Sequence, residues 1–165
     1  MVTDMLDIRF SSALKAMLYL AVAAERDAPD PSAHQSPEQH SPTLSSAQLA
    51  EVLGTNPSLV RKLLVPLVRA GLVESTKGRA GGARLAKPAS QITLAEIYRC
   101  SVGDKPLWAC RPDGAASCEV TANTAEFFSR LSADTEDAVL DVLGRRTLAD
   151  SLAEVRSLGS QTPAG

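Results

Sequence analysis

Two short helices joined by a tight turn are predicted near the middle of this chain of 165 residues. Ser45 and Gln48 have the spacing of a capping box, in which each side chain bonds the backbone N–H group of the other residue. Gly54 suits the left-handed conformation that ends many helices. Asn56 can cap a second helix with Pro57 in its first turn, where a missing N–H group costs nothing. Two helices this close together predict a helix-turn-helix.

The second helix, from Pro57 to about Ala70, presents two chemically different faces. Apolar residues recur every three or four positions and are expected to pack inward, together with one edge of the preceding helix. The inward set is Leu49, Val52 and Leu53 in the first helix and Leu59, Val60, Leu63, Leu64, Leu67 and Val68 in the second. The opposite face carries Ser58, Arg61, Lys62, Val65 and Arg69. A DNA-reading helix needs this division, because one side must be anchored while the other reaches bases and phosphates. Pro66 removes a helical hydrogen bond, so it is expected to kink the helix or to end its regular part near Leu64.

A glycine-rich hairpin with a basic tip follows. Residues 72–75 and 83–87 predict two short strands, the second stopped by Pro88. The turn between them contains three glycines together with Lys77 and Arg79. Glycines let a backbone come close to another molecule, and the two cations supply charge at the tip. Helix, helix and hairpin in this order predict a winged helix-turn-helix, which is a mainly α fold with a small β-wing.

Basic residues are concentrated in this part of an otherwise acidic chain. The net charge is −2, yet residues 56–87 contain seven basic residues against one acidic residue, whereas residues 119–156 contain eight acidic residues against four arginines. A local basic block is what a nucleic-acid surface requires, although a solvated charged face has the same composition. The candidate DNA contacts are Ser58, Arg61, Lys62, Arg69, Lys77, Arg79 and Arg84. A winged helix that binds another protein is the alternative of a different class.

The N-terminal segments complete a DNA-binding domain that we expect over residues 1–90. A first helix is predicted from about Ser11 or Ser12 to Glu25, because apolar residues recur there at intervals of three and four. Residues 28–43 contain four prolines and both histidines of the chain, so we expect a mobile loop.

Residues 91–120 are expected to form a linking helix and a cysteine-bearing sensor loop. Thr93 and Glu96 have the spacing of a second capping box, which opens a helix that reaches about Ser101. The irregular stretch after this helix holds two of the three cysteines.

A long helix is predicted from about Thr121 to Leu143, followed by a short helix after Thr147 and a disordered tail over 159–165. A helix of about 22 residues is about 33 Å long, more than a small winged domain can cover. Its apolar edge is therefore expected to pack on a second copy, giving a two-fold homodimer through residues 121–158. The predicted dimer contacts are Phe127, Phe128, Leu131, Val139 and Val142.

Four motifs match a known family pattern. They are GRAGGARLAKP (78–88) in the wing, ITLAEI (92–97) after it, ALKAMLYLA (13–21) in the first helix and RAGLV (69–73) at the end of the recognition helix. These motifs resemble the Rrf2 family of bacterial regulators, which includes IscR, NsrR and CymR. The resemblance extends over about residues 8–152.

The resemblance implies a homodimeric transcription regulator, usually a repressor, that binds a palindromic operator in double-stranded DNA. The recognition helix would enter the major groove, and the wing would enter the adjacent minor groove. By position, Ser58, Arg61 and Lys62 would face bases or phosphates, and Arg79 would be the cation at the wing tip. Ala83 stands where an aromatic residue often follows the paired glycines.

The cysteines allow an iron–sulfur sensor as one alternative. Family members with a cluster have three closely spaced cysteines and a fourth ligand that is histidine or a carboxylate. Cys110 and Cys118 resemble the first and last of these cysteines, with Cys100 farther upstream and no cysteine between them. Thr121 stands where IscR-type proteins place histidine, and Ser11 where NsrR-type proteins use aspartate. If a cluster exists, Cys110, Cys118 and Cys100 are its candidate ligands.

A thiol switch needs only two cysteines and no cofactor, and it is the sensing chemistry that we expect. A thiolate near positive charge can be oxidised to a sulfenic acid, which a second cysteine converts into a disulfide. Lys105 and Arg111 flank Cys110, and Cys118 precedes a long helix whose N-terminal dipole favours a thiolate. Cys100 is either a third participant or an inert buried residue.

Other function classes lack their signals. The chain has no phosphate-binding glycine motif with its lysine and no metal-ligand cluster at standard spacing, so an enzyme is not expected. Its longest apolar run, Ala13–Ala24, contains Lys15 and is shorter than the roughly 20 residues that span a membrane. The acidic N-terminus does not resemble a signal peptide, and an odd number of cysteines does not suggest a disulfide framework. These observations predict a cytoplasmic protein.

Overall fold

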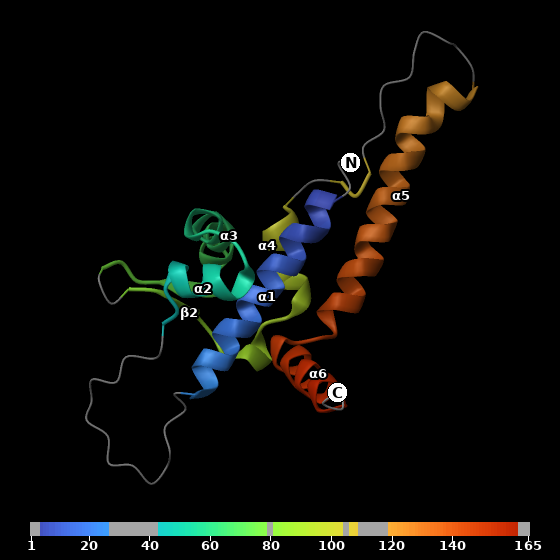
Figure 1. The fold of residues 1–165 in the computed structure, drawn as a ribbon. Coiled ribbons are helices and arrows are strands. Elements are labelled where there is room, and N and C mark those ends of the chain that lie inside the picture. Colours follow the sequence, from blue (N-terminus) through green and yellow to red (C-terminus); the bar gives the residue numbers. More distant parts are fainter. Residues whose placement is uncertain (1–3, 27–42, 79–80, 104–105, 109–118, 162–165) are drawn as a thin grey trace, which may run out of the picture.

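The computed structural model describes residues 4–26, 43–78, 81–103, 106–108 and 119–161 (Figure 1). Its elements are α1 (Asp4–Arg26), α2 (Ser46–Leu53), α3 (Pro57–Arg69), β1 (Val73–Ser75), β2 (Ala83–Leu85), the 3₁₀ helix η1 (Ala89–Gln91), α4 (Leu94–Val102), α5 (Glu119–Gly144) and α6 (Leu148–Gln161). The two strands form one antiparallel sheet. A mainly helical fold with a small β-wing is therefore confirmed.

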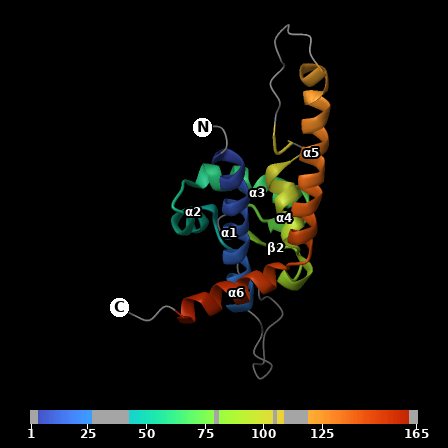
Figure 2. The ribbon, with the colours of Figure 1, turned by 90° about the vertical axis from the view of Figure 1, so that its right-hand side faces the viewer.

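Helix α1 runs through the centre of the fold and contacts α2, α3, α4 and α6, with α2 and α3 together on one side of it (Figures 1 and 2). Its apolar stripe is buried, and Ala13, Met17 and Leu20 are at most 1% exposed. These side chains share one core with buried residues of the other elements, which include Val60, Leu67, Leu72, Ile92, Ile97 and Leu148. Each large apolar side chain removed from water contributes about 1.5–3 kcal/mol. Burial around α1 is thus the main stabilising contribution to this fold.

The helix-turn-helix has the caps that the sequence predicts. The N–H group of Gln48 donates to the Ser45 hydroxyl at 3.2 Å, and the N–H group of Ser45 donates to the Gln48 side chain at 2.9 Å. Gly54 ends α2 with a φ of 63°, and the Leu59 N–H group donates to the Asn56 side chain at 3.0 Å. Both helices and the tight turn between them are confirmed.

The buried edge of this motif is narrower than its apolar pattern. Three residues that were predicted to pack inward are exposed, namely Val52, Leu59 and Val68. The buried residues of α3 are Val60, Leu64 and Leu67. Leu59 instead lines a groove of about 470 Å³ between α1 and α3, together with Ile8. The prediction was wrong for these three because neighbouring helices cover only part of each apolar stripe.

Two helix limits near the DNA-binding motif differ from the predictions. Helix α1 begins before Ser11, whose hydroxyl donates to the carbonyl of Ile8 at 3.2 Å instead of capping the helix. Helix α3 continues through Pro66 to Arg69, so the proline does not end it near Leu64. A proline removes one N–H donor but leaves its own carbonyl free to accept a hydrogen bond. Here the carbonyl of Pro66 accepts from the N–H group of Ala70.

The chain's C-terminal limits also differ. Helix α6 continues past Gly159 to Gln161, so residues 159–161, which were predicted to be disordered, are helical. The Ser160 hydroxyl donates to the Arg156 carbonyl at 3.1 Å within this last turn. The wing strands are shorter than predicted, three residues each.

The wing is joined to the N-terminal part of the chain by a backbone bridge. The Leu44 N–H group donates to the Ala83 carbonyl at 2.9 Å, and the Ala83 N–H group donates to the Leu44 carbonyl at 2.8 Å. Ala83 is buried at this point, in the core around α1. The bridge passes so close to Gly82 that a Cβ atom there would lie 2.8 Å from the Leu44 carbonyl oxygen and from Thr43 Cβ. The second of the paired glycines is therefore required by a close approach of backbone to backbone.

The C-terminal helices are connected to the core by another bridge. The Leu94 N–H group donates to the Arg146 carbonyl at 2.9 Å, and the Leu148 N–H group donates to the Ile92 carbonyl at 2.8 Å. Leu148 is fully buried, so α6 shares the core of the elements before it. Helix α5 extends well beyond that core (Figure 2). None of the described helices is long and apolar enough to cross a membrane.

We predict opposite effects for two glycine-to-alanine substitutions. Gly82→Ala places a methyl group against the Leu44 backbone and is expected to destabilise the fold by about 1–3 kcal/mol. Gly159→Ala meets no atom within 4 Å and is expected to stabilise α6 by about 0.5–1 kcal/mol. Thermal unfolding of the two variants measures both effects. A melting temperature of Gly82→Ala equal to that of the wild type would contradict the close packing of the wing.

Candidate nucleic-acid interface

The solvent-facing side of α3 forms a stripe of four residues, which we call the outward stripe. Its members are Ser58, Lys62, Val65 and Arg69. They follow one another by four, three and four positions, so in a helix of 3.6 residues per turn they lie almost in line. All four are exposed, and the exposed Arg61 lies beside them. Four of the five residues that were predicted on this face are candidate DNA contacts.

The outward stripe is held in place from the opposite side of α3. Val60, Leu64 and Leu67 are buried against the helices around them, and α3 contacts α1, α2 and α4. The Asn56 cap fixes the first turn of the helix and uses a backbone donor that would otherwise be unpaired. A helix anchored along one edge can present the other edge to a groove without changing its own structure.

The basic residues of the region differ in whether an acid neutralises them. Within the described part of the chain, Arg61, Lys62, Arg69 and Lys77 make no ion pair. Arg84 differs, because its guanidinium lies 2.6 Å from the carboxylate of Glu74 on the paired strand. Its charge is thus less available to an external phosphate than the charges of α3.

Lys87 is paired as well, on the far side of the wing. Its ammonium group lies 2.8 Å from the Glu96 carboxylate, which also accepts from Thr93 in a capping box. Burial raises the pKa of Glu96, but the hydrogen bonds from Lys87 and Thr93 outweigh it and lower the pKa below its usual value. Lys87 therefore stabilises the start of α4 and contributes little free charge.

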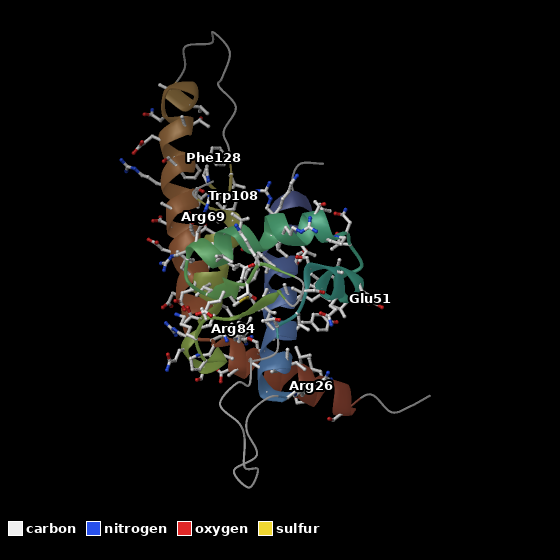
Figure 3. The ribbon with its side chains drawn as sticks, turned by 90° about the vertical axis from the view of Figure 1, so that its left-hand side faces the viewer. Arg26, Glu51, Arg69, Arg84, Trp108 and Phe128 are labelled. Carbon is white, nitrogen blue, oxygen red and sulfur yellow. The ribbon has the colours of Figure 1, made fainter. Side chains whose placement is uncertain are left out.

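The wing and α3 both belong to the face seen in Figure 3, from which Arg84 and Arg69 project. Lys77 is exposed at the base of the wing turn. Arg79, the predicted cation of the wing tip, lies outside the described residues. The structure thus brings together the α3 candidates and the wing strands on one side of the molecule.

Of the three candidate sensing residues, the structure describes Cys100 alone. It is half-buried in α4, and burial raises the pKa of its thiol, with the negative charge of Glu96 raising it further. A raised pKa keeps the thiol protonated and slows its oxidation, because the thiolate is the reactive form. Cys110 and Cys118 lie outside the described residues. Among the described residues no group of three or more His, Cys, Asp or Glu side chains could hold a metal ion.

A hydrogen bond that the sequence analysis missed attaches the segment before these cysteines to α5. The Leu107 N–H group donates to the Ser132 hydroxyl at 3.0 Å, and Ser132 is only 3% exposed. Trp108 projects from the segment that contains Leu107, and Phe128 projects from α5 (Figure 3). The one available signal was a serine among the apolar positions of the long helix, where a buried hydroxyl needs a partner.

The predicted dimer contacts form an apolar strip along α5. Phe127 and Val142 are each 60% exposed, Leu131 is 38% exposed, and Phe128 and Val139 are half-buried. The rings of Phe127 and Phe128 meet edge to face with centroids 5.5 Å apart. Large apolar side chains this exposed are usually covered by a partner.

The arrangement defines the class of the protein. A capped helix-turn-helix followed by a two-stranded wing, with exposed cations on the outer side of its second helix, is a winged helix-turn-helix of the DNA-binding type. A model of the Rrf2 family, described as iron-dependent transcriptional regulators, matches residues 6–154. The chain belongs to the Rrf2 family of transcription regulators, which are not enzymes.

The chain is also similar to individual known proteins in sequence and in fold. Protein aau3 of Rhizobium meliloti (strain 1021) is 38% identical over 71 residues, which are 43% of this chain and 46% of that protein. The chain spans about half the length of the curated relatives that it matches first. A transcriptional regulator from Lactobacillus plantarum has a TM-score of 0.70 at 22% identity, over 90% of both chains. The oxidised form of Staphylococcus aureus CymR has a TM-score of 0.54 at 23% identity, over 87% of this chain and 92% of that one.

Proposed function

We propose that this transcription regulator is a homodimeric repressor that binds a palindromic operator and is released by oxidation of cysteine thiols. The observation that carries its DNA contact is the set of cations on the outward side of α3, namely Arg61, Lys62 and Arg69, which pair with no acid among the described residues. Cations that no acid neutralises are free to replace the counterions of a phosphate backbone. In this proposal α3 enters the major groove, and the wing with Lys77 and Arg79 lies over the adjacent minor groove.

We expect Arg61→Ala and Lys62→Ala to weaken operator binding, and each to reduce the slope of log K against log salt by about 1, because each removes one phosphate contact. Arg84→Ala is expected to have a smaller effect, since Glu74 already neutralises much of that charge. Fluorescence anisotropy at several salt concentrations measures the slopes. Arg145→Ala on α5 removes an exposed, acid-paired cation that belongs neither to α3 nor to the wing, and it serves as the control.

A protein-binding winged helix is the other class that this experiment separates. Its affinity would depend only weakly on salt, because no condensed counterions would be released. Unchanged slopes in both α3 variants would contradict DNA contact through this helix.

Dimerisation in this proposal takes place through the apolar strip of α5. The helix has 26 residues, so it is about 39 Å long and reaches past the core that could cover it. A two-fold axis beside α5 would bring the same strip of two copies together, as an isologous interface requires.

Phe127→Asp is expected to weaken the dimer by more than a hundredfold, because an uncompensated charge in a buried interface costs about 3–5 kcal/mol. Sedimentation velocity across a range of concentrations measures this. Val155→Asp on α6 is the matched control, since Val155 is 52% exposed and lies outside the strip. The proposal fails if Phe127→Asp sediments as the wild-type dimer.

Sensing in this proposal uses Cys110 and Cys118. Peroxide would oxidise one thiol to a sulfenic acid with release of one water, and the second thiol would displace a second water to form the disulfide. Cys100 is poorly suited to this role, because burial and the charge of Glu96 raise the pKa of its thiol. The contact between Leu107 and Ser132 would carry a change in the cysteine segment to α5. An iron–sulfur cluster is the second candidate, and the family's description as iron-dependent favours it.

We expect Cys110→Ser and Cys118→Ser each to bind the operator normally and to remain bound after mild peroxide treatment. Cys100→Ser should be released like the wild type. Native mass spectrometry of protein purified without oxygen gives the independent readout, with a loss of two hydrogens per chain on oxidation. Detection of a dimer that carries iron and sulfide would contradict the thiol switch and favour the iron–sulfur cluster.

A further inference from the structure

One apolar side chain interrupts the outward stripe of α3. Val65 is 45% exposed and lies between Lys62 and Arg69 on that stripe. It takes no part in the core, which α3 contacts through Val60, Leu64 and Leu67. A valine in this place leaves apolar surface in water in the free protein, and it lies outside the core that stabilises the fold.

The chemistry of the major groove offers one apolar group to such a side chain. Base edges there present hydrogen-bond donors and acceptors, and thymine adds its 5-methyl group. Three residues of α3 follow Ser58 at intervals of three, four and seven positions, namely Arg61, Lys62 and Val65. Homeodomain recognition helices use these same steps to place side chains against base edges.

We propose that Val65 contacts the 5-methyl group of a thymine and thereby specifies a T·A pair in each half of the operator. This inference rests on the proposed DNA binding by α3 and adds a specificity-determining residue to it. The neighbouring Lys62 and Arg69 would hold the phosphates on either side of the contact. An apolar patch on a protein partner would suit Val65 but would desolvate those two cations without an acceptor, which is costly.

The test begins with operators selected from a random DNA library by the wild-type protein. Deoxyuridine then replaces, one at a time, each selected thymine in one half-site, which removes a single methyl group and changes no hydrogen bond. For the wild type we expect one of these replacements to weaken binding about fourfold, the contribution of one buried methyl group. For Val65→Ala the same replacement should change Kd less than twofold.

Val68→Ala is the matched control. Val68 is a valine of the same helix, 37% exposed but off the outward stripe, so its variant should keep the wild-type response to deoxyuridine. Both valines are exposed and the helix core is untouched, so circular dichroism should show wild-type folding in each variant.

Two results would overturn the inference and are distinguishable from failure of the proposed function. Wild-type protein that binds every deoxyuridine operator as tightly as the thymine operator has no methyl contact. A Val65→Ala variant that stays sensitive to the same replacement makes that contact through another residue. In either case weaker operator binding by Arg61→Ala or Lys62→Ala would still support DNA contact through α3, whereas unchanged salt slopes in both variants would contradict the proposed function itself.

Discussion

The narrow buried edge of α3 is the contact on which the proposed DNA-binding surface depends. Val60, Leu64 and Leu67 attach the helix to the core around α1, and everything on the other side stays in solvent. The Asn56 cap adds about 1 kcal/mol, whereas three buried apolar side chains contribute several kcal/mol in total. Packing along this edge therefore decides the direction of the outward stripe. A wider buried edge would take Lys62 out of water, and no acid among the described residues pairs with it to offset the cost.

Local signals in the sequence were sufficient to predict where α2, α3 and α4 begin. The capping boxes at Ser45 and Thr93 operate over three residues, so the residues themselves contain the information. Burial was predicted less well, and Leu59 illustrates the reason. Helical periodicity tells which residues share a side, but the width of the covered strip depends on neighbouring elements. The bridge from Leu44 to Ala83 was missed for the same reason, because its partners are distant in sequence.

The sequence predicted which residues lie at the candidate site, but it did not predict which of their charges are paired with an acid. Arg61, Lys62 and Arg69 fall on the outer face of α3 by periodicity alone, as expected. Arg84 was grouped with them on composition, yet the hairpin register sets it opposite Glu74, and the two side chains pair. That register depends on the backbone of the wing turn, which composition does not determine. Counting charges therefore overestimated the free charge of the wing.

Helix α4 connects the two ends of the proposed regulation. It contacts α1, α3 and α5, and its residues Leu94, Ile97 and Val102 are buried. A close-packed interior transmits displacement, so a shift of α5 against α4 reaches α3 through side chains already in contact. Since three side chains on one edge hold α3, a small rotation about that edge would redirect the outward stripe while the helix stays folded. In a two-fold dimer the same rotation would occur in both copies, and the spacing of the two recognition helices would no longer match the half-sites. Release from DNA would then require no unfolding of the winged helix.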